Sequence, residues 1–199
     1  MSKFYPVSRR NRMPHYMRFL VLASFITAIT AVGAITSFTL PFLTVVPFSL
    51  QVLGVYLAGG LLPPKWAFLS MMTYLILGAL GLPVFAEGGH GVAILVGPFG
   101  GYLWAFPVAA WAMSILTGST THKGRLIAGL AVNLIIIYLG GMIGLILTTH
   151  ATVPHAFLEG VVPFMGWDAL KAVIAFPIIR KARAFTIARW GEHSYRQAG

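Results

Sequence analysis

The hydrophobic pattern of this chain consists of long apolar runs separated by short connections rich in glycine, proline or charge. A bilayer-spanning helix needs about 20 predominantly apolar residues, and 199 residues leave room for six such helices with loops and tails. The pattern therefore predicts an all-α integral membrane protein with six transmembrane helices, although the second and sixth runs are short for a span. The predicted segments are Met17–Phe38, Ser49–Leu62, Trp66–Leu82, Pro98–Leu116, Leu126–Thr148 and Phe164–Ile179.

The composition supports the same class. Hydrophobic residues make up 58% of the chain and charged residues only 9%, whereas about 25% of residues are charged in an ordinary soluble domain. We therefore expect one membrane domain over 1–199, with a basic tail at 1–16, a helical bundle at 17–179 and a second basic tail at 180–199. The absence of cysteine excludes disulfides and thiolate metal sites.

The positive charges are distributed unevenly among the connections. In a six-helix arrangement, every lysine and arginine except Lys171 falls at the two tails or in the second and fourth connections. The positive-inside rule places these segments, and with them both termini, in the cytoplasm, so we expect a multi-pass protein of the cell membrane. The net charge of +10 does not point to nucleic acid, because the basic residues form no stripe on a soluble face.

Two opposite charges interrupt the sixth apolar segment. Asp168 and Lys171 lie three residues apart, so they share one face of a helix and can pair. A charge near the middle of a span costs about 2.5–3.5 kcal/mol on insertion scales, so a pair of charges here needs a physical reason. One interpretation is a neutral ion pair that only holds helices together, and the other is a polar ligand site in the outer half of the membrane.

The third connection, 81–91, combines several glycines with Phe85 and Glu87. Glycine allows tight turns and close approach to a ligand, so these two side chains could form a lid with one apolar and one polar element. A simple flexible connection is the alternative interpretation.

A ladder of small residues runs along the first apolar segment. Ala23, Thr27 and Ala31 recur every four residues, and small side chains at this spacing permit close approach of another helix in lipid. The sequence does not decide whether that helix belongs to this chain or to another protein.

Familiar catalytic and metal motifs are absent from the chain. There is no G-x-x-x-x-G-K-[ST] phosphate loop, no G-x-S-x-G elbow and no H-E-x-x-H zinc motif. His90, His150 and His155 lack the spacing of metal ligands. We therefore expect neither an enzyme nor a metal site, and hydrolysis of ATP through a phosphate loop would need partner subunits.

Four motifs, in order along the chain, resemble the BioY family, the biotin-specific substrate-binding (S) components of energy-coupling factor (ECF) transporters. They are Val46–Gln51, Leu77–Ala86, Gly97–Leu103 and Asp168–Ala172. The resemblance implies a six-helix membrane protein that captures biotin from the outer side for ATP-driven import. It also implies a transmembrane coupling protein and cytoplasmic ATPase subunits as partners, and no cofactor for this chain itself.

The resemblance further implies roles for particular residues. Glu87 falls in the loop that closes over the ligand, and the ladder on the first segment resembles the surface that docks onto the coupling protein. The implied substrate-binding residues are Asp168, Lys171, Glu87, Phe85, Gly100, Gly101, Tyr102 and Gln51, and the implied docking residues are Ala23, Thr27 and Ala31.

The chemistry of biotin is compatible with these residues. Its carboxylate requires a cation such as Lys171 or the N-terminal ends of helices. Its ureido N–H groups require acceptors such as Asp168, and its fused rings require apolar walls. The sequence leaves open which end of the ligand meets which residue. A secondary transporter or self-sufficient facilitator for biotin or another small carboxylate is the alternative function.

Overall fold

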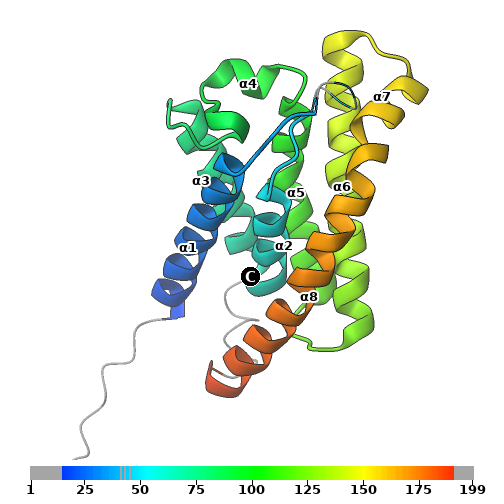
Figure 1. The fold of residues 1–199 in the computed structure, drawn as a ribbon. Coiled ribbons are helices and arrows are strands. Elements are labelled where there is room, and N and C mark those ends of the chain that lie inside the picture. The colour runs from blue at the N-terminus through cyan, green and yellow to red at the C-terminus, as the bar shows by residue number, and fades with distance from the viewer. Residues whose placement is uncertain (1–14, 41, 43, 45, 191–199) are drawn as a thin grey trace, which may run out of the picture.

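The computed structural model describes residues 15–40, 42, 44 and 46–190, and the regular structure of these residues is helical apart from one antiparallel bridge between Phe38 and Phe48. The all-helical fold expected from the sequence is thus confirmed for the described residues. In chain order the elements (Figure 1) are α1 (His15–Ile35), α2 (Gln51–Leu61), α3 (Pro64–Ala79), the 3-10 helix η1 (Ala86–Gly88), α4 (Val92–Val96), α5 (Gly100–Thr117), α6 (Lys123–Thr149), α7 (Val153–Gly160) and α8 (Val162–Trp190).

The six predicted apolar segments correspond to α1, α2, α3, α5, α6 and α8, with ends that agree within three residues except at the end of α8. Three stretches among the described residues are long and apolar enough to cross a membrane: Tyr16–Ile35, Lys123–Thr149 and Val162–Phe185. The described part of the chain therefore has the all-helical build of a multi-pass membrane protein.

The short helix α2 lies in the middle of the bundle, in contact with α1, α3, α5, α6 and α8 (Figure 1). Small residues make this position possible. Gly54 faces Thr30 of α1 and Gly59 faces Met113 of α5, and a Cβ atom at either glycine would overlap its neighbour. Because helices enclose α2, its first residues lie inside the molecule, where they contribute to a cavity.

The ladder on α1 packs inside the chain and not on its surface. Ala23 and Thr27 are buried, and Ala31 packs partly buried against the core. The Thr27 hydroxyl donates to the Ser70 carbonyl of α3 at 2.9 Å, and the Ser70 hydroxyl donates to the Ala23 carbonyl at 2.9 Å. In this structure the small side chains bring α1 and α3 together and leave Ala23 and Thr27 buried. The expected docking role of this face stays a prediction.

The last helix continues well beyond its predicted end. Residues 180–190, which the sequence places in the second basic tail, extend α8, and Arg183 is only 1% exposed. Its guanidinium donates to the Gly60 carbonyl at the end of α2, to the Thr120 carbonyl at 3.0 Å and to the Thr117 hydroxyl at 2.8 Å. One fork of N–H groups thus satisfies acceptors at the C-terminal ends of α2 and α5. The remaining predicted tail residues, 1–14 and 191–199, lie outside the described residues.

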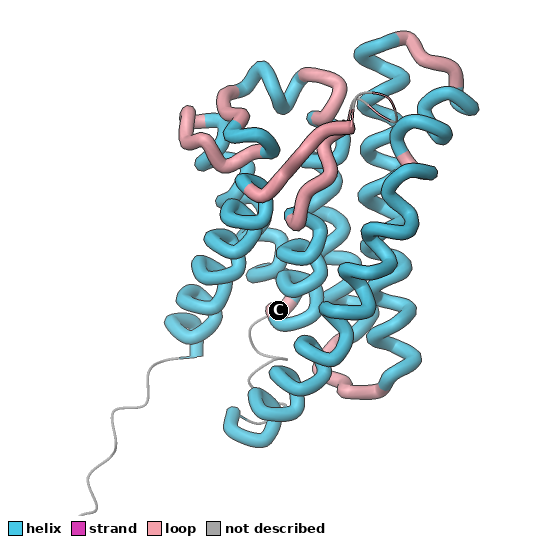
Figure 2. The backbone as a smooth tube through the Cα atoms, viewed as in Figure 1, coloured by secondary structure: helices cyan, strands magenta, loops and turns pink. Residues whose placement is uncertain are grey.

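The connections that include the predicted lid gather at one end of the bundle (Figure 2). There the α1–α2 connection lies near α4 and the 80–91 segment. At the same end of the bundle, α7 packs against the C-terminal end of α6. The first described turn of α1, the α5–α6 connection and the end of α8 lie at the opposite end. This arrangement leaves the lid segment and Arg183 at opposite ends of the molecule.

Candidate functional site

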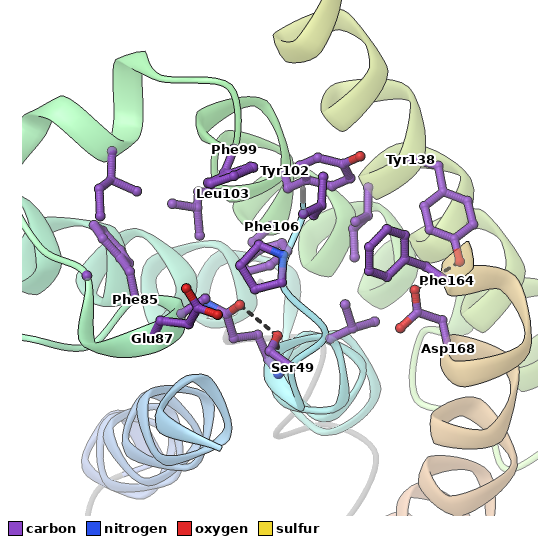
Figure 3. A pocket seen from close by; sticks show the side chains of 18 of the residues that line it. Ser49, Phe85, Glu87, Phe99, Tyr102, Leu103, Phe106, Tyr138, Phe164 and Asp168 are labelled. Carbon is purple, nitrogen blue, oxygen red and sulfur yellow. Dashed lines mark hydrogen bonds between the residues drawn. The ribbon is translucent and has the colours of Figure 1, made fainter. Parts of the chain in front are cut away.

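A cavity of about 340 Å³ lies among α2, α5, α6, α8 and the 85–89 segment, within the usual size range of small-molecule sites. Figure 3 shows that aromatic rings from several elements surround it and that Glu87 and Asp168 lie on opposite sides. The polar and aromatic residues that line it include Ser49, Gln51, Phe85, Glu87, Phe99, Tyr102, Phe106, Tyr138, Phe164, Asp168 and Lys171.

The predicted pair on α8 forms inside this cavity wall. Asp168 and Lys171 are each 3% exposed, and the Lys171 ammonium lies 2.6 Å from Asp168 Oδ1. The Tyr138 hydroxyl of α6 donates to Asp168 Oδ2 at 2.9 Å. The ammonium also lies 5.6 Å from the ring centre of Trp167, within the range of a cation–π contact. Both carboxylate oxygens are therefore held by a donor, which fixes the carboxylate in the cavity wall.

The start of α2 contributes an oriented amide. Gln51 accepts a hydrogen bond from the Ser49 hydroxyl at 2.8 Å and donates to the hydroxyl of Tyr74 on α3. Both Ser49 and Gln51 are buried and line the cavity. Hydrogen bonds on both sides of the amide fix which of its atoms faces which neighbour.

Phe85 and Glu87 form part of the cavity wall at its loop end. The Phe85 ring is buried against Gly78, where any Cβ atom would overlap it. The Glu87 carboxylate accepts from the Thr39 hydroxyl at 2.5 Å, and its backbone N–H donates to the Ser37 hydroxyl at 2.5 Å. The third connection is therefore joined to the α1–α2 connection by two hydrogen bonds.

Glu87 also has an unusual backbone conformation. Its φ is +56°, in the left-handed region, where a residue other than glycine is uncommon and costs conformational energy. The two hydrogen bonds to the α1–α2 connection hold the residue in this conformation and place its carboxylate at the cavity.

The glycines of the predicted site do not line the cavity. A Cβ atom at Gly100 would overlap the Leu95 carbonyl, and one at Gly101 would overlap the Gly140 carbonyl and Gly144 of α6. Their absence of a side chain serves the close packing of α5 against α4 and α6. Of the eight predicted substrate-binding residues, the structure thus brings Asp168, Lys171, Glu87, Phe85, Tyr102 and Gln51 together and leaves Gly100 and Gly101 outside.

Several cavity residues were not predicted from the sequence. Tyr138, Phe106 and Phe164 form aromatic walls, and Ser49 orients Gln51. Phe164 belongs to a Val-Pro-Phe motif that also occurs at Val46–Phe48, which is a weak signal for a common location. For Tyr138 the sequence carries no signal that separates it from aromatic residues facing lipid.

The charges at the cavity are two carboxylates and one ammonium, from Glu87, Asp168 and Lys171. Among the described residues, no group of three metal-ligating side chains is found. The site can therefore offer an ion pair, a fixed amide and aromatic surfaces to a partly polar ligand.

Known proteins are similar to this chain in sequence and in fold. Residues 7–187 match the model of the BioY family. A Thermotoga maritima protein named biotin transporter BioY is 37% identical over 87% of this chain and 100% of its own length. A Pyrococcus horikoshii protein named probable biotin transporter BioY is 40% identical over 83% of this chain and 96% of its own length.

A crystal structure of the S-component for biotin from an ECF-type ABC transporter superposes with a TM-score of 0.78 at 28% identity, covering 89% of this chain and 95% of that one. The family match covers most of the chain and includes all the helices that surround the cavity. The chain belongs to the BioY family.

Proposed function

We propose that this chain is the biotin-binding S component of an ECF-type vitamin uptake transporter. It captures biotin from the outer side of the cell membrane, and partner subunits drive import with ATP. Membership of the BioY family and the names of its relatives support the ligand. The observation that carries the site assignment is the buried Asp168–Lys171 pair in the wall of a cavity of about 340 Å³.

The ion pair favours one orientation of biotin. Asp168 and Lys171 together are neutral, so a neutral cyclic urea can bind them without adding charge to a low-dielectric site. The ureido N–H groups donate to free lone pairs of Asp168, and the ureido carbonyl accepts from the remaining N–H groups of Lys171. A carboxylate in the same place would leave one buried negative charge uncompensated, which is costly. The valerate chain then extends away from the pair, along the aromatic walls.

The proposed topology is a single membrane domain of six spans with both termini in the cytoplasm. The start of α1 and the end of α8 lie at the same end of the bundle (Figure 1), as an even number of crossings requires. The basic residues of the connections and tails support a cytoplasmic location for that end. The lid segment and the cavity then belong to the outer half.

The proposed partners are a transmembrane coupling protein and cytoplasmic ATPase subunits. Support comes from the solved relative, whose name places it in an ECF-type ABC transporter. Uptake of biotin in cells with and without the coupling protein and ATPases separates this function from a self-sufficient facilitator, which needs neither.

Binding of labelled biotin to the purified protein tests the function and the site separately. Wild type should bind, whereas Asp168→Asn and Lys171→Ala should bind far more weakly. Glu159→Gln is a matched control, because the carboxylate of this outer-end acid pairs with His155 at 3.2 Å and is partly exposed. Undiminished binding in both site variants contradicts the site assignment, and failure of wild type to bind contradicts the function.

A further inference from the structure

Gln51 belongs to a chain of hydrogen bonds that leads out of the cavity wall. The Ser49 hydroxyl donates to Gln51 Oε1 at 2.8 Å, Gln51 Nε2 donates to the Tyr74 hydroxyl, and Tyr74 donates to the Val84 carbonyl at 2.8 Å. The links run from the start of α2, across α3, to the connection that carries Phe85. The chain of bonds therefore joins a residue of the cavity wall to the segment that forms the loop end of that wall.

Each bond in this chain has only one possible direction. The Val84 carbonyl can only accept, so Tyr74 donates to it and the Tyr74 oxygen accepts from the amide nitrogen of Gln51. The amide oxygen of Gln51 then faces the Ser49 hydroxyl. As a result, Gln51 has one N–H and one lone pair left for a ligand, in an orientation that Tyr74 and Ser49 hold.

Tyr74 lies behind the cavity wall but contacts much of it. The side chain is fully buried. Its ring meets Phe85 edge-on at 5.5 Å between ring centres and stacks beside Phe106 at 6.4 Å, and both of these residues line the cavity. Tyr74 is therefore placed to transmit a change at Gln51 to the covering segment without touching the ligand.

We propose that Tyr74 is a positioning residue that couples the amide of Gln51 to the 84–87 segment, so that a ligand engaging Gln51 also holds the cover of the cavity in place. A ligand that accepts the remaining N–H of Gln51 fixes the amide, the amide fixes the Tyr74 hydroxyl, and the hydroxyl fixes the Val84 carbonyl. The identity of the ligand as biotin rests on the proposed function. Because the cover must loosen before the ligand leaves, the coupling slows release more than capture.

Removal of the Tyr74 hydroxyl tests the coupling, with a second tyrosine as the matched control. Tyr74→Phe keeps the ring contacts and removes both hydrogen bonds. Tyr56→Phe removes a hydroxyl that is equally buried on α2 but has no hydrogen-bond partner among the described residues. Two measurements on the purified full chain are needed: association and dissociation rates of labelled biotin, and backbone hydrogen exchange of residues 80–91 without biotin.

We expect biotin to dissociate from Tyr74→Phe at least about five-fold faster, because one net hydrogen bond contributes about that factor and the variant removes two. The association rate should stay close to that of wild type. Exchange in residues 80–91 should also be faster. Tyr56→Phe should change neither quantity. An unchanged dissociation rate in Tyr74→Phe, or equal effects of the two variants, overturns the proposal, because general packing would then explain the result.

The hydrogen-exchange measurement tests the coupling even if wild type does not bind biotin or if Tyr74→Phe does not fold. If wild type does not bind biotin, the proposed function fails. The hydrogen-exchange result on ligand-free protein then still tests the coupling: faster exchange in Tyr74→Phe supports the link between Tyr74 and the 84–87 segment, and unchanged exchange overturns that link. If Tyr74→Phe does not fold, Ser49→Ala breaks the same chain at its other end. That variant must then show faster exchange in residues 80–91, and unchanged exchange overturns the proposal.

Discussion

The ion pair on α8 allows stability and ligand binding to be measured apart. In Lys171→Met the ammonium is lost while a long apolar side chain remains, so Asp168 keeps a buried charge with Tyr138 as its hydrogen-bond donor. In the double variant Asp168→Asn/Lys171→Met both charges are gone, and the new amide can still accept from Tyr138. We expect the single variant to be unstable, the double variant to be nearly as stable as wild type, and neither to bind biotin.

The size of the effect follows from the burial of the pair. Both side chains are only 4% exposed and the two charged atoms lie 2.6 Å apart. Removal of one partner of such a pair costs about 3–5 kcal/mol, because an uncompensated charge stays buried, whereas replacement of both partners is often neutral. In a chain of 199 residues, 1 kcal/mol moves the Tm by roughly 2–4 °C. The single variant should therefore melt about 6–20 °C below wild type.

Thermal unfolding and labelled-biotin binding in the same detergent check both parts. Glu159→Gln, which removes an exposed ion pair with His155, should move the Tm little. A double variant as unstable as the single one would refute the electrostatic reasoning. A double variant that is stable and binds biotin like wild type would refute the role of the pair in the ligand site, and would leave it as an ion pair that only joins helices.

Three further substitutions have defined outcomes. Arg183→Met should lower the free energy of unfolding by about 3 kcal/mol, because it leaves buried carbonyls without their charged donor. Lys181→Met, at an exposed position of the same helix, should change the Tm little. Gly78→Ala should weaken biotin binding measured by calorimetry, because its Cβ would displace the ring that covers the cavity. Gly101→Ala should lower the Tm, because its Cβ would force α5 away from α6, and the protein that still folds should bind biotin. Gly166→Ala, at a position with open space around it, is the control for both glycine variants.

The helices of the bundle were predictable because each leaves a long apolar run bounded by glycine, proline or charge. The two short outer helices were not predictable in the same way. α4 has only five residues and α7 has eight, and helices of this length owe their stability to packing rather than to their own sequence. Both lie between the predicted apolar segments, at the loop end of the molecule.

The polar half of the site was easier to predict than its aromatic half. Asp168 and Lys171 are unusual in an apolar run, and the free-energy cost of placing charges in the membrane is reason enough to predict a role for them. Glu87 and Phe85 were predicted because they belong to a glycine-rich connection. Tyr138 looks like any aromatic residue of a membrane helix, since helix rotation decides whether a ring faces lipid, a neighbour or a cavity. That rotation depends on contacts between helices and leaves no local pattern in the sequence.

Arg183 illustrates the same limit for a charge. The sequence assigns it to a tail because the apolar run ends near Ile179, whereas the structure buries it at 1% exposure against carbonyls of α2 and α5. The reason lies in a different part of the chain: α2 has only 11 residues, so its last carbonyls end inside the bundle and need donors there. A long arginine on the neighbouring helix supplies these donors. The burial of Arg183 thus depends on the length of a neighbouring helix, which its own part of the sequence does not show. Lys171, in contrast, was recognisable because the sequence of its own helix is apolar on both sides of it.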